Sequence, residues 1–383
     1  MNRRHFLQAG CACGLGAFAG ISAAQEPWLV PPRFSRPDIA SDEGGLWAIM
    51  DREETKLRRS PFNMREPQLQ AYVQDIACRL GGEHCPDIRV HLVRTPYFNA
   101  SMAPNGMMQV WSGLLLRVDN EAQLGAVLGH EIAHYLERHS LERLRSAKSS
   151  SAFGQFLGLF GAVGLIGQLG LIAGQFAYSR ENELAADRIG ALLMSRAGYD
   201  VAEAGKVWGN ITLEVNARPS GGGSSNPFFA THPAREDREA ALVELAAAYK
   251  GGATNESAWQ ERTAPFLRQW LQDEVKRGQH EESIAFLTRA AARLAAKAEY
   301  LYARGEVYRL RAGEGDLDAA LKDFQGATAA GHEPPETHRS LGMIYRATKR
   351  AADARASFER YLRLAPDAAD VLMIRSYMEE LSV

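Results

Sequence analysis

The sequence has almost no net charge, and that shortage narrows the possible functions. Its 383 residues include 44 Lys and Arg and 46 Asp and Glu, so the formal net charge is −2. Without a basic excess the chain lacks the electrostatic attraction on which nucleic-acid binding depends, and we expect no nucleic-acid partner. The 46% of hydrophobic and 23% of charged residues suit one large or two ordinary globular domains.

The N-terminus has the layout of a secretory signal peptide. Two arginines precede a charge-free run that ends in small residues before Gln25. Residues 3–7 also resemble the core of a bacterial twin-arginine signal, but Asn2 and Gln8 differ from the usual neighbours, so the general secretory route stays open. A membrane anchor fits less well because the run is short and rich in glycine. We therefore predict a signal peptide over 1–24 and a periplasmic location.

Cysteine is scarce, and removal of the signal peptide would leave only two of the four cysteines, Cys78 and Cys85. In an oxidising compartment this pair could close a small loop between the end of a helix and the next strand. Sequence alone does not decide between a disulfide and two free thiols, because a disulfide needs two backbones that approach closely.

Helical and strand periodicities alternate through the middle of the chain. They predict helices over 62–80, 120–145 and 180–198, strands over 87–95 and 107–111, and a flexible loop over 216–233. Asp119 or Asn120 is the expected cap of the second helix, and Gly198 ends the third.

Residues 152–178 carry no charge and are long enough to span a membrane. Seven glycines and three glutamines are spread along this segment, which weakens that interpretation. We favour a glycine-rich helical hairpin that covers the active site or makes peripheral contact with a membrane surface.

The C-terminal region has the spacing of tetratricopeptide repeats. Residues of the expected types recur at Gly305, Tyr308, Ala320 and Phe324 and again at Leu341, Gly342, Tyr345, Ala354, Phe358 and Pro366. A third helical pair over 266–295 is less clear. We predict a repeat domain over 256–383 after a catalytic domain over 25–255. Because repeats bury their faces by stacking, the array should lean on further helices or on the catalytic domain.

The segment "AVLGHEIAHYLERHS" (126–140) contains the motif His-Glu-x-x-His within the second predicted helix. Residues four apart share a helix face, so His130 and His134 can point at one metal ion. Glu131 is rotated by about 100° from His130 and can act on water without binding the metal. A catalytic zinc keeps an open position for a water, which it acidifies and from which Glu131 can take the proton. A merely solvated helix face fits poorly, because the neighbouring residues are apolar.

The motif does not supply the third ligand. His139 is nearest, but on one continuous helix it lies about 180° from His130, so we interpret it as a surface or packing histidine. Glu183 in "SRENELAAD" is the better candidate, on a separate helix that could cross the first. Asp187 follows on the same face, where it could accept the N–H of a ligand histidine and fix its tautomer.

Four segments together resemble the zinc metallopeptidases of family M48, especially the bacterial periplasmic members with C-terminal tetratricopeptide repeats. They are "NASMAPNG" with "VWSGLL" (99–115), "LGHEIAHYLERHS" (128–140), "SRENELAAD" (179–187) and "THPAREDR" (231–238). The resemblance implies an α+β fold: a zincin-type (gluzincin) metalloprotease domain, mainly helical with a small sheet, followed by an α-helical repeat domain. It also implies one Zn²⁺ per chain, held by His130, His134 and Glu183, with Glu131 as the base.

The same resemblance implies roles for two further regions. The strand of Met107, Met108, Gln109, Val110 and Trp111 would be an edge strand that pairs with an extended peptide substrate. His232 would either stabilise the oxyanion of the reaction or occupy the fourth zinc position as a removable plug, although it could simply cap the next helix. Arg238 would support the loop of His232 or the oxyanion.

Two functions follow from these features. The first is a zinc endopeptidase of the cell envelope that cleaves misfolded or stalled envelope proteins. The second is a chaperone-like interaction protein of outer-membrane assembly, with a latent or regulated metal site. The repeats suggest docking to envelope or outer-membrane assembly machinery in both cases.

Overall fold

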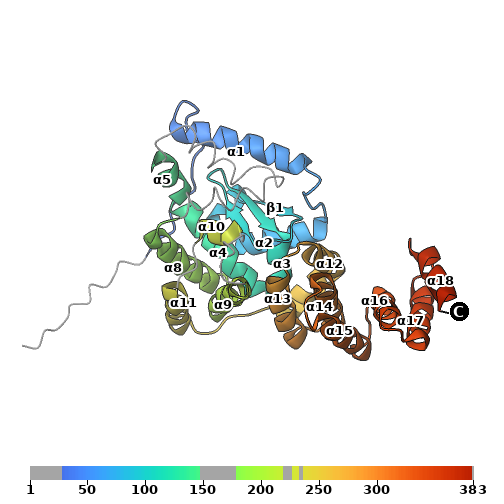
Figure 1. Ribbon diagram of the computed structural model, residues 1–383. Coiled ribbons are helices and arrows are strands. Elements are labelled where there is room, and N and C mark those ends of the chain that lie inside the picture. Colours follow the sequence, from blue (N-terminus) through green and yellow to red (C-terminus); the bar gives the residue numbers. More distant parts are fainter. Residues whose placement is uncertain (1–27, 147–177, 219–226, 233–235, 382–383) are drawn as a thin grey trace, which may run out of the picture. The chain divides into compact units, whose positions relative to one another are not determined.

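The computed structural model describes residues 28–146, 178–218, 227–232 and 236–381 (Figure 1). The chain divides into two compact units, 1–31 and 32–383. The predicted signal peptide and the charge-free segment, except for Tyr178, lie outside the described residues. Among the helices that are described, none is long and apolar enough to cross a membrane.

A three-stranded sheet forms from β1 (Arg89–Val93), β2 (Ala100–Met102) and β3 (Met107–Trp111), in the order β1-β3-β2. β1 pairs with β3 in parallel, and β2 pairs with β3 antiparallel. A turn at Asn105 and Gly106 joins β2 to β3. Gly106 has a φ of 87°, in the left-handed region that glycine adopts without strain.

The sheet order corrects the prediction that Met107–Trp111 is an edge strand. β3 lies in the centre of the sheet, and all five of its residues are buried. Its hydrogen-bonding groups are therefore shared with β1 and β2. β2 was not predicted and has an unpaired side in the described sheet, because strand order depends on pairing between distant segments and not on local periodicity.

Helices surround this sheet in the first half of the chain. They are α1 (Asp42–Arg59), α2 (Pro67–Gly81), α3 (Ser112–Arg117), α4 (Glu121–Leu136) and α5 (His139–Ser146), with a 3₁₀ helix η1 (Gly82–Asp87) after α2. Every residue of α4 is buried. The side chain of Asn120 caps α4 by accepting a hydrogen bond from the Gln123 N–H.

The helix predicted over 120–145 is in fact two helices. α4 ends at Leu136, and α5 begins at His139. Between them Arg138 has a φ of 57°, which a continuous right-handed helix does not contain. The chain therefore turns sharply, and α5 does not continue the direction of α4.

Four further helices follow the charge-free segment: α8 (Arg180–Arg196), α9 (Ala202–Asn216), α10 (Pro227–Thr231) and α11 (Glu236–Ala248). α10 falls within 216–233, which the sequence predicted as loop, so that prediction was wrong for residues 227–231. Gly198 follows α8 with a φ of 80°, as expected of a residue that ends a helix.

Two glycines let α4 and α8 approach closely. A Cβ at Gly190 would lie 3.1 Å from the backbone nitrogen of His130, and one at Gly129 would lie 3.3 Å from the carbonyl oxygen of Gly190. Both distances are tighter than ordinary van der Waals contact. The crossing point thus lies next to His130, and glycine at both positions brings the two helices together there.

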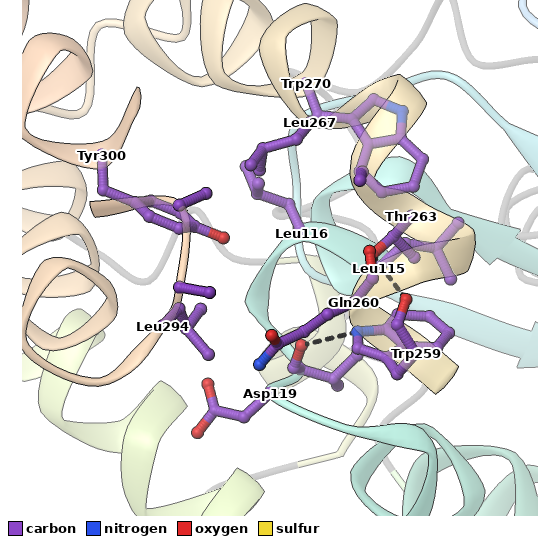
Figure 2. A pocket seen from close by; sticks show the side chains of 14 residues that line it. Leu115, Leu116, Asp119, Trp259, Gln260, Thr263, Leu267, Trp270, Leu294 and Tyr300 are labelled. Atoms are coloured by element: carbon purple, nitrogen blue, oxygen red, sulfur yellow. Dashed lines mark hydrogen bonds between the residues drawn. The ribbon is translucent and has the colours of Figure 1, made fainter. Parts of the chain in front are cut away.

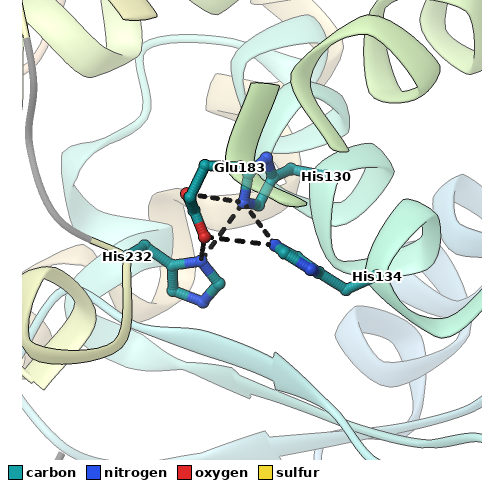
Figure 3. A group of neighbouring side chains, drawn as sticks. All are labelled: His130, His134, Glu183 and His232. Carbon is teal, nitrogen blue, oxygen red and sulfur yellow. Dashed lines mark hydrogen bonds and ion pairs between the residues drawn. The ribbon is translucent and has the colours of Figure 1, made fainter. Parts of the chain in front are cut away.

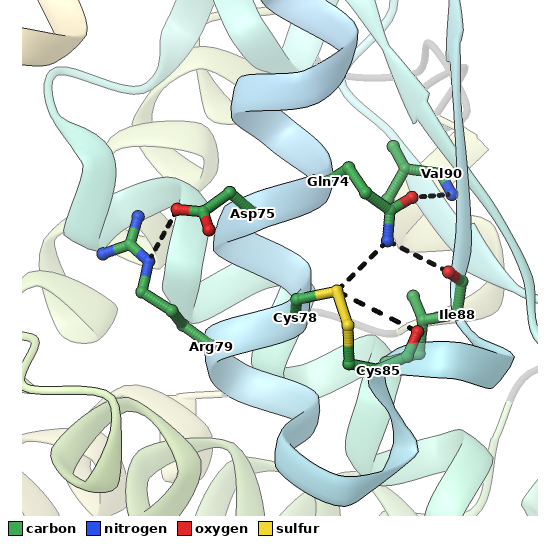
Figure 4. Close-up of a disulfide and its surroundings, with 7 residues drawn as sticks. All are labelled: Gln74, Asp75, Cys78, Arg79, Cys85, Ile88 and Val90. Atoms are coloured by element: carbon green, nitrogen blue, oxygen red, sulfur yellow. Dashed lines mark hydrogen bonds and ion pairs between the residues drawn. A yellow bond between two sulfur atoms is a disulfide. The ribbon is translucent and has the colours of Figure 1, made fainter.

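Cys78 near the end of α2 and Cys85 in η1 form a disulfide (Figure 4). Gln74 lies beside it and donates a hydrogen bond to the carbonyl oxygen of Ile88, while its own side-chain oxygen accepts one from the Val90 N–H. The disulfide and Gln74 therefore fix the connection from α2 into β1. Of the two alternatives for this cysteine pair, the structure has the bonded one.

The C-terminal region is entirely helical in its ordered elements. These are α12 (Glu256–Lys276), α13 (His280–Arg293), α14 (Lys297–Arg311), α15 (Asp316–Ala330), α16 (Glu336–Ala347), α17 (Ala351–Leu364) and α18 (Val371–Glu380). Gly305 faces the ring of Phe324, and Gly342 faces the ring of Phe358, with no room for a Cβ at either glycine. The residues that suggested a repeat thus lie at helix contacts, and the assignment to tetratricopeptide repeats stays a prediction.

A buried network of charges joins α12 and α13 to the first half of the chain. Arg117, which is 3% exposed, donates to Glu214 of α9 and to Glu274 of α12, each over 2.7 Å. Arg289 of α13 donates to Asp119 over 2.6 Å. Removing one of these buried charged side chains would leave its partner as an uncompensated buried charge, which destabilises the fold.

Beside this network lies a cavity of about 140 Å³, lined mainly by apolar side chains of α3, α12 and the connection between α13 and α14 (Figure 2). The indole N–H of Trp259 donates to the carbonyl oxygen of Val118 at its edge. None of its lining residues belongs to the histidine motif.

Candidate metal centre

His130, His134, Glu183 and His232 gather at one point (Figure 3). One possible ligand atom from each residue lies within 4.8 Å of all the others, and all four residues are buried. α4 supplies two histidines, α8 supplies the glutamate, and His232 directly follows α10. Three nitrogens and a carboxylate in this arrangement are the ligand types of a catalytic zinc site.

His130 contacts Asp187, the residue one turn after Glu183 on α8. Its Nδ1 donates to Asp187 Oδ1 over 2.9 Å, which leaves Nε2 facing the cluster. Arg238 donates two hydrogen bonds of 2.8 Å to the carboxylate of Asp187. Burial alone would raise the pKa of Asp187, but the hydrogen bonds and charge of Arg238 lower it, so Asp187 is an anion that fixes the His130 tautomer.

His134 is oriented by residues that the sequence did not indicate. Its Nε2 faces the cluster, 3.1 Å from Nε2 of His130, and its Nδ1 lies 2.8 Å from Nδ1 of His139. The ring of Tyr178 stacks on it with centroids 3.8 Å apart. Burial lowers the pKa of His134 well below its ordinary value, which keeps the ring neutral.

Glu183 lies in the first turn of α8, which is capped by the side chain of Ser179. Arg238 reaches it as well, with Nη1 2.5 Å from Glu183 Oε2. Burial would raise the pKa of Glu183, but the charge of His232 and the neighbouring ring nitrogens of His134 and His232 hold it well below its usual range. The cluster therefore contains one permanent negative charge.

Glu131 stands beside the four clustered residues and is 2% exposed. The backbone N–H of Met102 donates to its carboxylate. Its Oε1 lies 3.4 Å from Nε2 of His232 and has no hydrogen-bond partner in the described part of the chain. Burial raises the pKa of Glu131. A buried carboxylate oxygen without a partner is unusual in a structural role and suits a group that handles protons.

His232 lies between the other three clustered residues and Glu131. Its Nδ1 is 2.9 Å from Glu183 Oε1 and 3.2 Å from His130 Nε2. The ring stacks on Phe228, one turn earlier, with centroids 4.5 Å apart. Its side chain is thus committed to the cluster, and in this conformation it does more than cap the following helix.

The structure brings together most of the side chains that the sequence singled out, but not all in the expected way. The guanidinium of Arg238 binds the carboxylates of Asp187 and Glu183. It therefore holds these carboxylates in place and does not face the position of an oxyanion. β3 contributes no free edge. His139 is 6% exposed and lies against His134, so of the two interpretations of this residue, surface or packing, the structure excludes the surface one. No local sequence signal places His139 beside His134, because only the break between α4 and α5 at Arg138 brings it there.

The match to known proteins agrees with this geometry. Residues 63–246 match the family model described as Peptidase family M48. The mitochondrial metalloendopeptidase OMA1 of Schizosaccharomyces pombe is 34% identical over 153 residues, which cover 39% of this chain and 44% of that protein.

Two bacterial proteins are also similar. The putative beta-barrel assembly-enhancing protease of Vibrio cholerae is 29% identical over 226 residues, covering 53% of this chain and 45% of that protein. The beta-barrel assembly-enhancing protease of Escherichia coli K12 is 27% identical over 210 residues, covering 48% and 43%. The chain spans less than half the length of each of these relatives. All the clustered side chains fall inside the matched range, and residues 63–246 are therefore a domain of peptidase family M48.

Proposed function

We propose that this chain is a zinc-dependent endopeptidase of the bacterial cell envelope that cleaves misfolded or stalled envelope proteins. One observation carries the proposal: the buried cluster of His130, His134, Glu183 and His232, with Glu131 beside it. Paired histidines, a carboxylate ligand and a separate carboxylate base are the parts that metal-assisted peptide hydrolysis needs.

The cellular setting is part of the same proposal. The names of the two bacterial relatives, beta-barrel assembly-enhancing proteases, support a role at the envelope. We also propose that the chain has a signal peptide over 1–24 and is located in the periplasm. It would consist of a catalytic domain over 25–255 and a tetratricopeptide-repeat domain over 256–383 that docks to assembly machinery. The helix contacts of Gly305 and Gly342 with aromatic rings support the repeat assignment.

His130, His134 and Glu183 would hold the zinc ion. When bound, the ion would act as a Lewis acid that acidifies water and polarises the peptide carbonyl. Asp187 keeps the His130 proton on Nδ1, so that Nε2 offers its lone pair to the cluster. Arg238 keeps Asp187 and Glu183 charged and in place.

Glu131 would act as the general base and then as the proton donor to the leaving amine. Its buried position raises its pKa. The pKa of Glu131 is therefore closer to the operating pH than the pKa of an exposed glutamate, as a general base requires. The Met102 N–H fixes one side of its carboxylate, so the other oxygen is available for proton transfer.

The substrate would pair with β2, and not with β3 as the sequence predicted. The Ala103 N–H and the Asn99 carbonyl oxygen pair with β3, so by the alternation of an antiparallel ladder the backbone groups of Ala100 and Met102 point to the other side. The Met102 N–H on that side already donates to Glu131, so an extended peptide would pair with the backbone groups of Ala100 and the carbonyl oxygen of Met102, and would pass close to Glu131. Such pairing reads backbone rather than side chains, which suits unfolded substrates.

The test is the variant Glu131→Gln, with His134→Ala as the metal-ligand control. Glu131→Gln should retain about one zinc per chain and lose at least about 10²-fold in cleavage of an unfolded reporter, because the base is gone. His134→Ala should lose the zinc. Wild-type cleavage by Glu131→Gln would refute the mechanism, and full zinc occupancy in His134→Ala would refute the ligand assignment. Full physiological rescue by the uncleaving Glu131→Gln variant would instead favour the chaperone-like function.

A further inference from the structure

The two ligand histidines have different supports. His130 donates to the anionic Asp187, whereas the Nδ1 of His134 faces the Nδ1 of His139 at 2.8 Å. This distance is that of a hydrogen bond, so one of the two nitrogens carries the proton and the other accepts it. A neutral imidazole has only one N–H, and the pair can therefore exist in two tautomeric arrangements.

Only one arrangement is compatible with metal binding. His134 directs Nε2 into the cluster, 3.4 Å from Glu183 Oε1, and this nitrogen must offer a lone pair to an ion. Its proton must then be on Nδ1 and be donated to His139. His139 must in turn accept at Nδ1 and carry its own proton on Nε2.

We propose that His139 is a positioning residue that fixes the tautomer and ring orientation of His134 and so sets the metal affinity of the site. The inference rests on the proposed zinc site and assigns a role that the histidine motif does not contain. Asp187 does the same for His130, but with a charged acceptor, so the two halves of the site are supported by different chemistry.

The local fold supplies the geometry that this role requires. The left-handed turn at Arg138 reverses the chain after α4, and this turn returns His139 to His134. Ser140, the next residue, lies 3.0 Å from the hydroxyl of Tyr178, whose ring stacks on His134. The start of α5 therefore fixes the edge of the His134 ring through His139 and its face through Tyr178.

A packing role and a positioning role for His139 predict different zinc affinities for suitably chosen variants. Asn and Leu have the same branched skeleton of heavy atoms, and both remove the aromatic ring of His, so neither restores its packing. Only Asn can place an acceptor oxygen near the position of the His139 Nδ1. The pair His139→Asn and His139→Leu thus separates loss of the hydrogen-bond acceptor from loss of the ring.

The experiment measures the zinc dissociation constant of the full chain by competition with a chromophoric chelator, in wild type, His139→Asn and His139→Leu. We expect His139→Leu to bind zinc about 10- to 100-fold more weakly, as is typical for loss of a partner of a ligand histidine, and His139→Asn to stay within a few-fold of wild type. The thermal unfolding of the metal-free forms should be similar in the two variants.

Other outcomes overturn the inference. Equal weakening in both variants would assign His139 to packing, and unchanged affinity in both would remove it from the site. Zinc binding by the wild type in either of these cases would leave the proposed function intact, whereas a wild type that binds no zinc would reject both. Nitrogen-15 NMR of the zinc-bound wild type gives a second readout: a proton on Nε2 rather than Nδ1 of His134 would also contradict the assignment.

Discussion

At the scale of single residues, His232 has contacts with opposite consequences for activity. Its Nδ1 lies among the proposed ligand atoms, 2.9 Å from Glu183 Oε1, and its Nε2 lies 3.4 Å from Glu131, the proposed base. A side chain in this position can block access to the site, and it can also stabilise charge that develops there during the reaction. Which effect dominates should depend on the substrate.

For His232→Ala we expect faster cleavage of an unfolded reporter, because its free backbone can pair with β2 once the site is unblocked. A folded substrate should be cleaved more slowly, by up to about 10²–10³-fold if a donor to the oxyanion is lost. Initial rates on both substrates, with zinc content measured in parallel, test this. Thr231→Ala is the matched control, because the Thr231 hydroxyl donates to Phe228 and not to the cluster. Slower cleavage of the unfolded reporter with zinc retained would reject the blocking role.

At the scale of elements, the crossing of α4 and α8 decides whether the proposed ligands meet. Glu183 and Asp187 on α8 reach the histidines of α4 because the two backbones touch at Gly129 and Gly190. A methyl group at Gly190 would press on the backbone nitrogen of His130 itself, which cannot move without moving the ligand.

Gly190→Ala should therefore weaken zinc binding and lower the melting temperature, since overpacking of this kind costs about 1–3 kcal/mol. Gly205→Ala in α9 is the matched control: its added Cβ would meet nothing closer than Val243, at 3.9 Å. Because glycine inside a helix costs about 0.5–1 kcal/mol relative to alanine, Gly205→Ala should stabilise the protein. Calorimetry and chelator competition on both variants measure the difference. Wild-type zinc affinity in Gly190→Ala would show that the close crossing is not needed.

The sequence predicts those parts of the site that local spacing determines. His130 and His134 are four residues apart on one helix, and Glu183 and Asp187 are four apart on another, so each pair could be placed on a common face. His139 could not be placed, because its position follows from the turn at Arg138, and a positive φ at arginine has no sequence signature. The central position of β3 depends on the parallel pairing of β1 with β3, which is equally invisible to periodicity.

At the scale of the whole molecule, the buried charges around Arg117 tie the C-terminal helices to the peptidase domain. Glu274 of α12 is fully buried. Burial would raise its pKa, but the charges of Arg117 and Arg277 and the hydrogen bonds of Arg117 and Ser283 outweigh burial and lower the pKa to about 2. The folded protein therefore holds this carboxylate ionised far more strongly than the unfolded chain does.

This difference predicts how stability depends on pH. A carboxylate whose pKa is lowered from 4.5 to about 2 stabilises the fold above pH 4.5 and loses that contribution as the pH falls toward 2. Glu274→Gln should lower the free energy of unfolding by about 3 kcal/mol at pH 6, and its deficit should shrink toward zero near pH 2. Urea titrations at several pH values measure this. Glu261→Gln, at an exposed site on the same helix, should have little effect at any pH. A pH-independent deficit in Glu274→Gln would contradict the ionic origin.

The turn between β2 and β3 has a chemical consequence for the ageing of the protein. Asn followed by Gly is prone to deamidation, in which the glycine nitrogen attacks the asparagine side chain. Here the Gly106 N–H donates to the Ala103 carbonyl oxygen, while the Asn105 side chain donates to Asp51 and accepts from the Met107 N–H. These hydrogen bonds keep the Gly106 nitrogen from attacking the Asn105 side chain for as long as the sheet is folded. Deamidated Asn105 should therefore accumulate only in molecules whose sheet has opened, and its amount in a stored sample would record how often that happened.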